Sequence, residues 1–354
     1  MPETITLPNL LAGWPCVPSI SPYHEEVARE SRAWIEGYQP LSPKSQARFD
    51  RCEFPLVATL AYPEVSREHV RLAADFMMWF ALFDEITDVK TGSETRKLAE
   101  KLIAIMRYPT TVLLEGDPIL VQKTQDLWLR TLAFSVSSSA NKLLLSLEQY
   151  ILAVCEEAED REIKRVRNIQ EYLALRRGSA ASEAIYLLGS LHIDIPETVM
   201  SHPMVRRLTL LGGNLVCIHN DIYSYNFERA HGVHGHNLVT AVMKEKGLGV
   251  QGAISYSGTL FQQTVLEFME NVSQVSILFA GEEGLNVYIG CMLKFVVALD
   301  EYSFLSPRYF GEKRFQVRRT LTIQLAPEPQ GREYDSLFAM KGEMESCQMT
   351  TVDQ

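Results

Sequence analysis

Two polar stretches of the sequence place oxygen-bearing side chains at helical spacing directly after apolar runs. The first is Phe83–Asp88, with the sequence FDEITD, and the second is Asn220–Glu228, with the sequence NDIYSYNFE. Apolar residues three and four apart precede each stretch, so the oxygens are expected to project from the end of a helix that otherwise forms an apolar wall. Such oxygens are the ligands that hard cations prefer. The sequence therefore predicts cation-binding groups beside a dry pocket.

Asp84 and Asp88 stand four residues apart in a helix predicted over Ser66 to Asp88. Both carboxylates then lie on one helix face. Mg²⁺ takes one or two protein carboxylates together with waters and phosphate oxygens, which suits this pair. Glu85 points about a quarter-turn away, so we expect it to support the metal ligands without binding the metal itself. A solvated acidic helix end has the same spacing, and the pair alone leaves both interpretations open.

Asn220, Ser224 and Glu228 recur at four-residue intervals and form one stripe. An amide oxygen, a hydroxyl and a carboxylate can chelate a metal without repelling a diphosphate. Helix capping and ordinary surface polarity are the alternatives. However, the stripe begins directly after an apolar segment that contains Gly212 and Gly213, which permit close helix packing. We therefore interpret the stripe as a second set of metal ligands.

Two basic elements accompany the acidic ones. Arg176 and Arg177 precede Gly178, in a segment that is weak helix material and is expected to break or kink the helix beside the pocket. Arg308 and Tyr309 supply another cationic donor beside a phenol. Guanidinium groups bind phosphate in a bidentate manner, although exposed ion pairing would also explain them. An apolar wall with metal ligands and arginines at one end fits a substrate that is apolar at one end and anionic at the other, such as a prenyl diphosphate.

Composition excludes several other classes of function. The chain has 354 residues, 46% of them hydrophobic, and a net charge of −10, so it lacks the basic surface that nucleic acids require. Its six cysteines are scattered singly, which predicts reduced thiols and a cytoplasmic location. A secretory signal has a basic start followed by a sustained apolar run, and residues 1–15 have neither. The most apolar stretch, Val287 to Leu299, is too short for membrane insertion and contains Lys294.

The hydrophobic pattern predicts an all-α protein. Residues 20–325 are expected to form one domain of roughly ten or more helices around a central apolar cavity. Residues 1–19 are predicted to be extended, and residues 326–354 to form a flexible tail. No alternating strand pattern is present. The predicted helices are Ser21–Tyr38, Ser66–Asp88, Ser93–Met106, Pro118–Phe134, Ser138–Glu159, Asn168–Leu188, Pro203–Glu228, Asn237–Lys246, Val250–Phe279 and Glu283–Phe310, with Ser66, Ser93 and Asn168 as polar caps.

Taken in order, these motifs resemble those of class I terpene synthases, over about residues 20–312. In that family an aspartate-rich motif and an Asn/Ser/Glu triad clamp three Mg²⁺ ions on the substrate diphosphate. The resemblance implies that Asp84 and Asp88 belong to the first motif and that Asn220, Ser224 and Glu228 form the triad. It further implies that Arg176 or Arg177 senses the diphosphate. The pair Arg308 and Tyr309 would bind the diphosphate when the site closes.

Finer features are similar to fungal sesquiterpene synthases, nearest to the Δ6-protoilludene synthase group. They include the segments PYHEEV from Pro22, SRAWI from Ser31 and HNLV from His236. The resemblance implies cyclisation of farnesyl diphosphate through a 1,11-closure, by a monomer or homodimer. A chain-elongating prenyltransferase and a non-catalytic helical scaffold remain as alternatives. The former should carry a second aspartate-rich motif instead of the triad, and the latter has no use for the ligand set.

Two positions depart from the family pattern. Phe227 stands where a lysine is frequent, with Arg229 as a candidate replacement for that cationic contact, and Phe304 stands where a tryptophan is common. Aromatic faces stabilise carbocations, so Phe80 and Phe83 are predicted to do this, with Trp79 and Phe304 as weaker candidates. Core packing explains each of them equally well. The loop Arg229–His236 is expected to close as a lid, and its three histidines offer only weak support for zinc.

Overall fold

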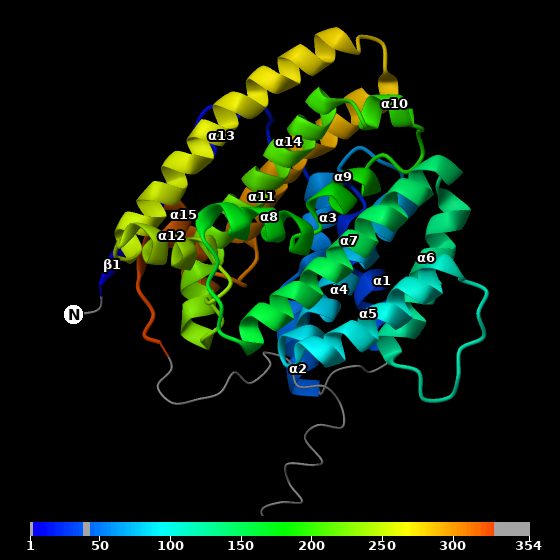
Figure 1. Ribbon diagram of the computed structural model, residues 1–354, viewed down its shortest axis with the longest axis horizontal. Coiled ribbons are helices and arrows are strands. Elements are labelled where there is room, and N and C mark those ends of the chain that lie inside the picture. Colours follow the sequence, from blue (N-terminus) through cyan, green and yellow to red (C-terminus); the bar gives the residue numbers. More distant parts are fainter. Residues whose placement is uncertain (1–2, 38–42, 329–354) are drawn as a thin grey trace, which may run out of the picture.

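The computed structural model describes residues 3–37 and 43–328, and nearly all of its elements are helices (Figure 1). The prediction of an all-α fold is therefore confirmed. The elements of the first half are β1 (Thr4–Thr6), α1 (His24–Glu36), α2 (Pro43–Arg51), α3 (Phe54–Ala61), α4 (Arg67–Asp88), α5 (Gly92–Arg107), α6 (Ile119–Phe134), α7 (Ser137–Glu162) and α8 (Ile169–Ser179). Those of the second half are α9 (Ser182–Leu188), α10 (Glu197–Met200), α11 (Pro203–His231), α12 (Leu238–Lys246), α13 (Val250–Leu278), α14 (Glu283–Leu305), the 3-10 turn η1 (Gly311–Lys313), α15 (Arg314–Thr320) and β2 (Thr322–Gln324).

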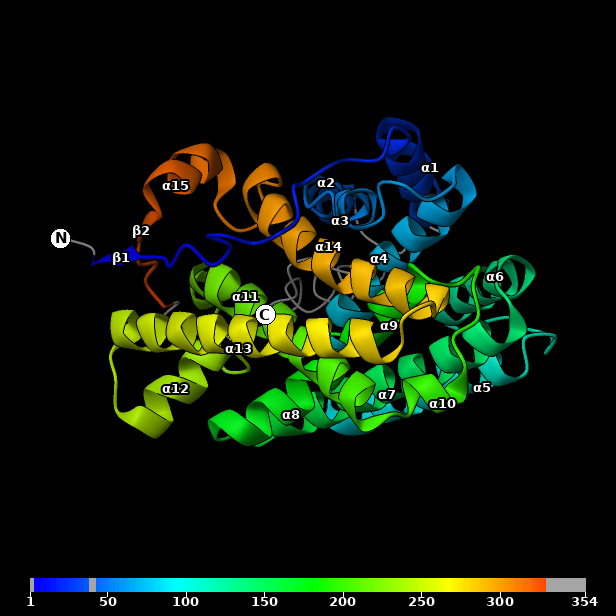
Figure 2. The same cartoon turned by 90° about the horizontal axis from the view of Figure 1, so that it is seen from above.

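Six helices form a closed ring in which each one packs on the next: α3, α4, α7, α8, α11 and α14, with α14 returning to α3. Other helices pack on the outside of this ring. Helix α13 packs along α11 and α12, whereas α5 and α6 pack against α7 and against each other, and α6 also packs on α4. Figures 1 and 2 show α12 and α15 at one end of the molecule and α5 and α6 at the opposite end. Apolar stripes on the ring helices create the wall that the sequence predicts.

Helix starts follow local side-chain chemistry. Ser66 caps α4 by accepting a hydrogen bond from the backbone N–H of His69 at 3.3 Å, and Asn168 caps α8 in the same way. The prediction that Ser93 caps the next helix is wrong. Thr91 is the cap instead, because Thr91 and Glu94 form a reciprocal capping box that starts α5 two residues earlier.

The helix predicted over Asn168 to Leu188 is interrupted where its weak segment lies. Helix α8 ends at Ser179 and α9 begins at Ser182, with Ala181 between them at φ +50°. A left-handed conformation costs a non-glycine residue about 1–2 kcal/mol. Because Ser179 and Ala181 border the central cavity, this break gives the cavity wall an irregular backbone.

The sequence analysis missed a pair of short strands. Strand β1 pairs antiparallel with β2, with Thr4 opposite Gln324, and thus ties the predicted extended segment to the segment that follows α15. Each strand has three residues, too few to produce a readable alternation. Ala326 N–H donates to Asn226 Oδ1 of α11 at 2.8 Å, so the predicted tail begins with residues bonded to the domain. The tail from residue 329 onward lies outside the described residues.

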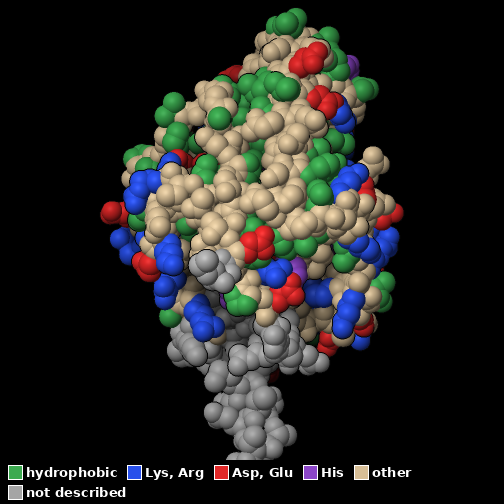
Figure 3. All heavy atoms as spheres, turned by 90° about the vertical axis from the view of Figure 1, so that its left-hand side faces the viewer, with side chains coloured by type: hydrophobic (Ala, Val, Ile, Leu, Met, Phe, Trp, Pro, Cys, Tyr) green, Lys and Arg blue, Asp and Glu red, His purple; other side chains and the backbone are tan. Residues whose placement is uncertain are grey.

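The surface carries charges of both signs. On the face shown in Figure 3, Lys and Arg side chains lie interspersed with Asp and Glu rather than forming a continuous basic area. Such a mixture agrees with the net charge of −10. Within residues 3–37 and 43–328, no helix has the length and apolar character needed to cross a membrane.

Candidate active site

The ring of helices encloses a cavity of about 660 Å³, within the size range of small-molecule sites. All six ring helices contribute to its wall. The two ends of the wall differ in chemistry. One end is apolar and is lined by Val57, Met77, Phe80, Ala81, Val154, Ile185, Val216, Phe295 and Leu299. The other end is polar and contains both predicted ligand sets together with arginines.

Helix α4 brings Asp84 and Asp88 to the cavity, as their spacing predicts. Asp84 opens into the cavity but is surrounded by protein, and this enclosure raises its pKa to about 7, with Asp88 adding to the effect. The hydroxyl of Tyr150 donates to Asp84 Oδ1 at 2.7 Å. Asp88 Oδ1 lies 3.6 Å from the guanidinium of Arg161. We refer to Asp84 and Asp88 as the α4 lip.

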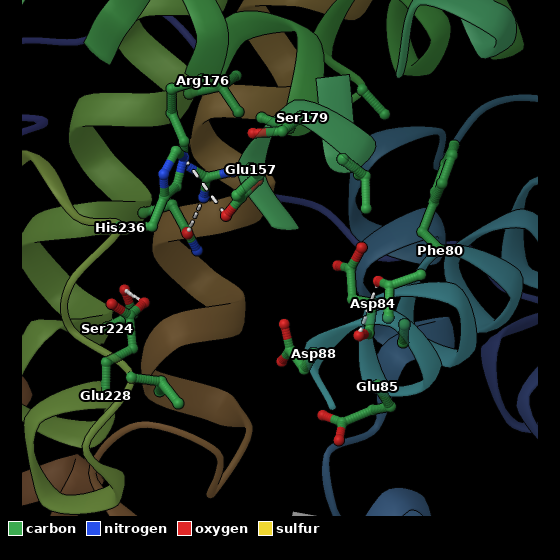
Figure 4. Close-up of a pocket in the computed structure, with 18 of the residues that line it drawn as sticks. Phe80, Asp84, Glu85, Asp88, Glu157, Arg176, Ser179, Ser224, Glu228 and His236 are labelled. Atoms are coloured by element: carbon green, nitrogen blue, oxygen red, sulfur yellow. Dashed lines mark hydrogen bonds and ion pairs between the residues drawn. The ribbon is translucent and has the colours of Figure 1, made fainter. Parts of the chain in front are cut away.

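Helix α11 brings Asn220, Ser224 and Glu228 to the opposite side, and we refer to these three as the α11 lip. Ser224 Oγ donates to Glu228 Oε1 at 2.5 Å, and Asn237 Nδ2 donates to Glu228 Oε2 at 3.0 Å. Burial raises the pKa of Glu228 to about 7, and the charge of Asp221 adds to this. Figure 4 shows Ser224 and Glu228 of this lip on one side of the cavity and the α4 lip on the other, with open space between them.

The two adjacent arginines point to different places. Arg176 lines the cavity, where its guanidinium donates to Asn220 Oδ1 at 2.9 Å and to Asp221 Oδ1 at 3.1 Å. Arg177 does not line the cavity. Its guanidinium instead donates to Asn214 at 2.9 Å, and its stem packs against Gly213, where an added Cβ would lie 3.2 Å from Arg177 Cγ. The sequence left these two residues undecided, and only Arg176 faces the ligand sets.

The C-terminal pair joins the α11 lip. Arg308 and Tyr309 both line the cavity, and Asn220 Nδ2 donates to the Tyr309 hydroxyl at 2.9 Å. Asn220 thus contacts Arg176 through its oxygen and Tyr309 through its nitrogen. Through this single amide, the α11 lip connects the two basic elements that the sequence analysis singled out.

Of the four predicted aromatic residues, only Phe80 lines the cavity. It packs edge-on against Tyr150, with ring centroids 5.1 Å apart. Phe83 is fully buried and stacks on Trp79 at 5.7 Å, and the Trp79 indole N–H donates to Thr124 of α6. That face of α4 is turned toward α6, so neither ring reaches the cavity. Phe304 packs against Phe310 instead.

Helix α11 continues past Glu228 to His231, so the predicted loop Arg229–His236 is shorter than expected and begins at Gly232. Arg229 does not line the cavity but donates to the Ala326 carbonyl at 2.8 Å, away from the ligand sets. The three histidines diverge: His231 contacts the Phe227 carbonyl, His234 lies near Glu328, and His236 faces the cavity. They form no shared ligand set.

Several cavity residues escaped the sequence analysis. Tyr150 and Glu157 both project from α7, seven residues apart and therefore on one helix face, a spacing that the sequence contained. Burial raises the pKa of Glu157. His236 Nε2 lies 3.3 Å from Glu157 Oε1, and burial together with Arg176 lowers the pKa of His236 to about 3. In Figure 4 Glu157, His236 and Arg176 form a group at one end of the polar wall.

The donor set fits divalent cations. Both lips offer hard oxygen ligands, and the carboxyl groups of Asp84 and Glu228 have raised pKa values because burial disfavours their charged forms. A divalent cation between the lips would offset that cost. The two lips leave space between them, which suits an ion that keeps part of its coordination for water or phosphate oxygens.

Comparison with known proteins agrees with this geometry. Residues 75–267 match the family model described as terpene synthase family 2, C-terminal metal binding. The chain is 32% identical to a Δ6-protoilludene synthase of Stereum hirsutum, covering 92% of this chain and 89% of the relative. It is 35% identical to sesquiterpene synthase Agr8 of Cyclocybe aegerita, covering 90% of each.

Solved structures share the fold at lower identity. Germacradien-4-ol synthase from Streptomyces citricolor superposes with a TM-score of 0.70 at 23% identity, covering 81% of this chain and 98% of that one. α-Eudesmol synthase superposes with a TM-score of 0.74 at 19% identity, covering 83% of this chain and 99% of that one.

Proposed function

This chain belongs to the terpene synthase family, and on that premise we propose that it converts farnesyl diphosphate into a cyclic sesquiterpene and diphosphate. The observation that carries the proposal is the division of one enclosed cavity into an apolar end and a polar end with oxygen ligands on two facing lips. A prenyl chain suits the first end and a metal-bound diphosphate the second. Relatives named sesquiterpene synthases support the C15 substrate.

The family description supports a divalent metal, and we propose Mg²⁺, with three ions per site. Asp84 and Asp88 would hold metal from one side and Asn220, Ser224 and Glu228 from the other. Bound Mg²⁺ supplies positive charge that stabilises the departing diphosphate. Glu85 also borders the cavity but is only 5% exposed, which favours a role in supporting the metal ligands over direct contact with the metal.

The chain's own residues are proposed to act as follows. Arg176, Arg308 and Tyr309 bind the diphosphate oxygens and orient the C1–O bond, which breaks with both electrons leaving on the diphosphate. The apolar wall keeps water from the resulting allylic cation, and the face of Phe80 stabilises positive charge as the chain folds. Loss of one proton from the cyclised cation then gives the hydrocarbon.

Incubation of the purified chain with farnesyl diphosphate and Mg²⁺ tests this function. We expect a C15 hydrocarbon in gas chromatography with mass detection, and no product after EDTA treatment until Mg²⁺ is restored. A longer prenyl diphosphate would instead identify a chain-elongating enzyme, and unchanged substrate would identify a non-catalytic protein. Δ6-Protoilludene, formed through a 1,11-closure, is the first product to look for, since several relatives carry that name.

We further propose that residues 20–325 act as one catalytic domain. The cytoplasmic location and the choice between monomer and homodimer stay predictions from the sequence.

A further inference from the structure

Arg308 is surrounded by aromatic rings at the polar end of the cavity. Its guanidinium carbon lies 4.9 Å from the ring centre of Phe54, 5.5 Å from that of Phe227 and 5.9 Å from that of Tyr309. These rings come from α3, α11 and the segment after α14, three parts of the chain that are distant in sequence. All three, and Arg308 itself, line the cavity.

The guanidinium of Arg308 forms no direct ion pair with a carboxylate. Within residues 3–37 and 43–328, no carboxylate oxygen lies within 4 Å of it, although Glu85 acts on it as a more distant opposite charge. Its polar contacts are the Cys52 thiol at 3.4 Å and the Tyr309 hydroxyl. Arg176 differs, because its charge is compensated by Asp221. Aromatic faces attract a cation without neutralising it. Because no described carboxylate pairs with it directly, Arg308 can turn its positive charge toward an anion in the cavity.

The surrounding backbone is fixed by other contacts. The Cys52 carbonyl accepts hydrogen bonds from the Tyr302 hydroxyl at 2.6 Å and from Ser306 Oγ at 2.9 Å, which secures the end of α14 just before Arg308. These bonds set where the chain passes but leave the long arginine side chain free to choose among rotamers. The rings of Phe54 and Phe227 restrict it, together with the Cys52 thiol and Tyr309.

We propose that Phe54 and Phe227 are positioning residues that hold the guanidinium of Arg308 toward the substrate diphosphate. The proposal rests on the proposed function, since it takes the anion to be a diphosphate. Replacing either ring by leucine keeps an apolar side chain in place but removes the aromatic face. The arginine then loses its restraint, and the affinity of the site for diphosphate falls.

The inhibition constant of inorganic diphosphate, measured in the presence of Mg²⁺, separates this role from contact with the prenyl chain, which inorganic diphosphate lacks. We expect Phe227→Leu and Phe54→Leu each to raise this constant about 3- to 10-fold. Arg308→Gln should raise it by at least as much. Phe227→Tyr, which restores a ring, should stay within about twofold of the wild type. Calorimetric binding of diphosphate gives the same constants for variants with slow turnover.

Phe315→Leu is the matched control. Phe315 packs against Arg314 at 4.6 Å, a contact of the same kind, but lies outside the cavity, so both turnover and diphosphate inhibition should be unchanged. Thermal unfolding of every variant checks that the fold persists.

Three outcomes would overturn the proposal: leucine variants with unchanged diphosphate inhibition, an Arg308→Gln variant with unchanged inhibition, or a Phe227→Tyr variant as impaired as Phe227→Leu. Failure of the proposed function is a distinct result, namely a wild-type chain that leaves farnesyl diphosphate unconverted. In that case calorimetry with Mg²⁺ and diphosphate still tests whether the rings act through Arg308.

Discussion

The two lips of the cavity have the same helical spacing but very different surroundings. On the α11 lip, Asn220 contacts Arg176 and Tyr309, while Glu228 accepts hydrogen bonds from Ser224 and Asn237. On the α4 lip, the Asp84 carboxylate accepts one hydrogen bond from the described residues, from Tyr150, and Asp88 Oδ1 lies 3.6 Å from Arg161. The α11 lip is therefore organised by the protein itself. Among the described residues, the Asp84 carboxylate accepts fewer hydrogen bonds than the Glu228 carboxylate.

This difference has a physical basis in the helices that carry the lips. Helix α11 lies inside the ring with α8, α12, α13 and α14 around it, so polar groups from several neighbours reach its ligands. Helix α4 ends at Asp88, whereas α11 continues three residues beyond Glu228 to His231. We infer that metal and diphosphate find the α11 lip preformed and draw the α4 lip toward them.

The largest effect is expected from removing the main ligand of each lip. Asp84→Asn and Asn220→Ala should each lower kcat/KM about 100- to 1,000-fold, because each removes a group that stabilises the leaving diphosphate. Added Mg²⁺ should restore part of the lost activity in Asp84→Asn, because the α4 lip adapts to the ion. It should restore little in Asn220→Ala, because the lost amide also orients Arg176 and Tyr309. Equal response of both variants to Mg²⁺ would show that the lips do not differ in organisation.

The adjacent arginines offer a second comparison, internal to the α11 side. Arg176→Gln should lower kcat/KM about 10- to 100-fold, because it removes a charged donor from the polar wall and leaves the buried Asp221 without its ion pair. Arg177→Gln should change kcat/KM less than about twofold, since the group it removes bonds to Asn214 outside the cavity. Steady-state measurement of kcat/KM for the two variants shows which arginine acts in the cavity. A larger loss in Arg177→Gln would contradict the assignment.

Much of this site was predictable because four-residue spacing in a helix places side chains on one face whatever the fold. That rule suffices for Asp84, Asp88 and the α11 triad, and Arg176 falls beside a break that weak helix formers predicted. The spacing rule does not choose between Arg176 and Arg177. Their side chains point about 100° apart around the helix, and the neighbouring helices decide which of them faces the cavity. Phe83 was misassigned for the same reason, since only the position of α6 turns it away from the cavity.

Tertiary contacts explain what the sequence could not predict. Tyr150 reaches Asp84 across 66 positions of the chain, and Phe54 meets Arg308 only after α3 packs on α14. Neither residue belongs to a motif. The elements α2, α3, α10 and α15 were missed as well. Helices α10 and α15 have four and seven residues, too few for periodicity to stand out, whereas α2 is mostly polar and α3 is apolar along nearly its whole length.

A smaller effect is expected from the one hydrogen bond that supports the α4 lip. Tyr150→Phe removes the donor to Asp84 and should raise the Mg²⁺ concentration for half-maximal activity about 10-fold, the usual scale for groups that orient a metal ligand. Tyr186→Phe is the matched control. Tyr186 is buried in the core, and its hydroxyl has no partner among the described residues, so its loss should not change the Mg²⁺ response. Similar Mg²⁺ curves for both variants would show that Tyr150 is not needed to orient Asp84.

The smallest effect concerns the stability of the metal-free protein. Although the Asp84 residue is exposed to the open cavity, the protein around its carboxyl group raises its pKa to about 7 from an ordinary value of 3.8, so between these values the folded chain binds more protons than the unfolded chain. The contribution of Asp84 to stability is therefore complete below about pH 4 and is lost as the pH rises through 7. Asp84→Asn does not titrate, so in EDTA we expect it to unfold on the order of one to three degrees above the wild type at pH 8, with the difference vanishing toward pH 4. Thermal unfolding across this range measures it. A variant that is less stable than the wild type at pH 8 would mean that the folded protein already accommodates the charged form of Asp84.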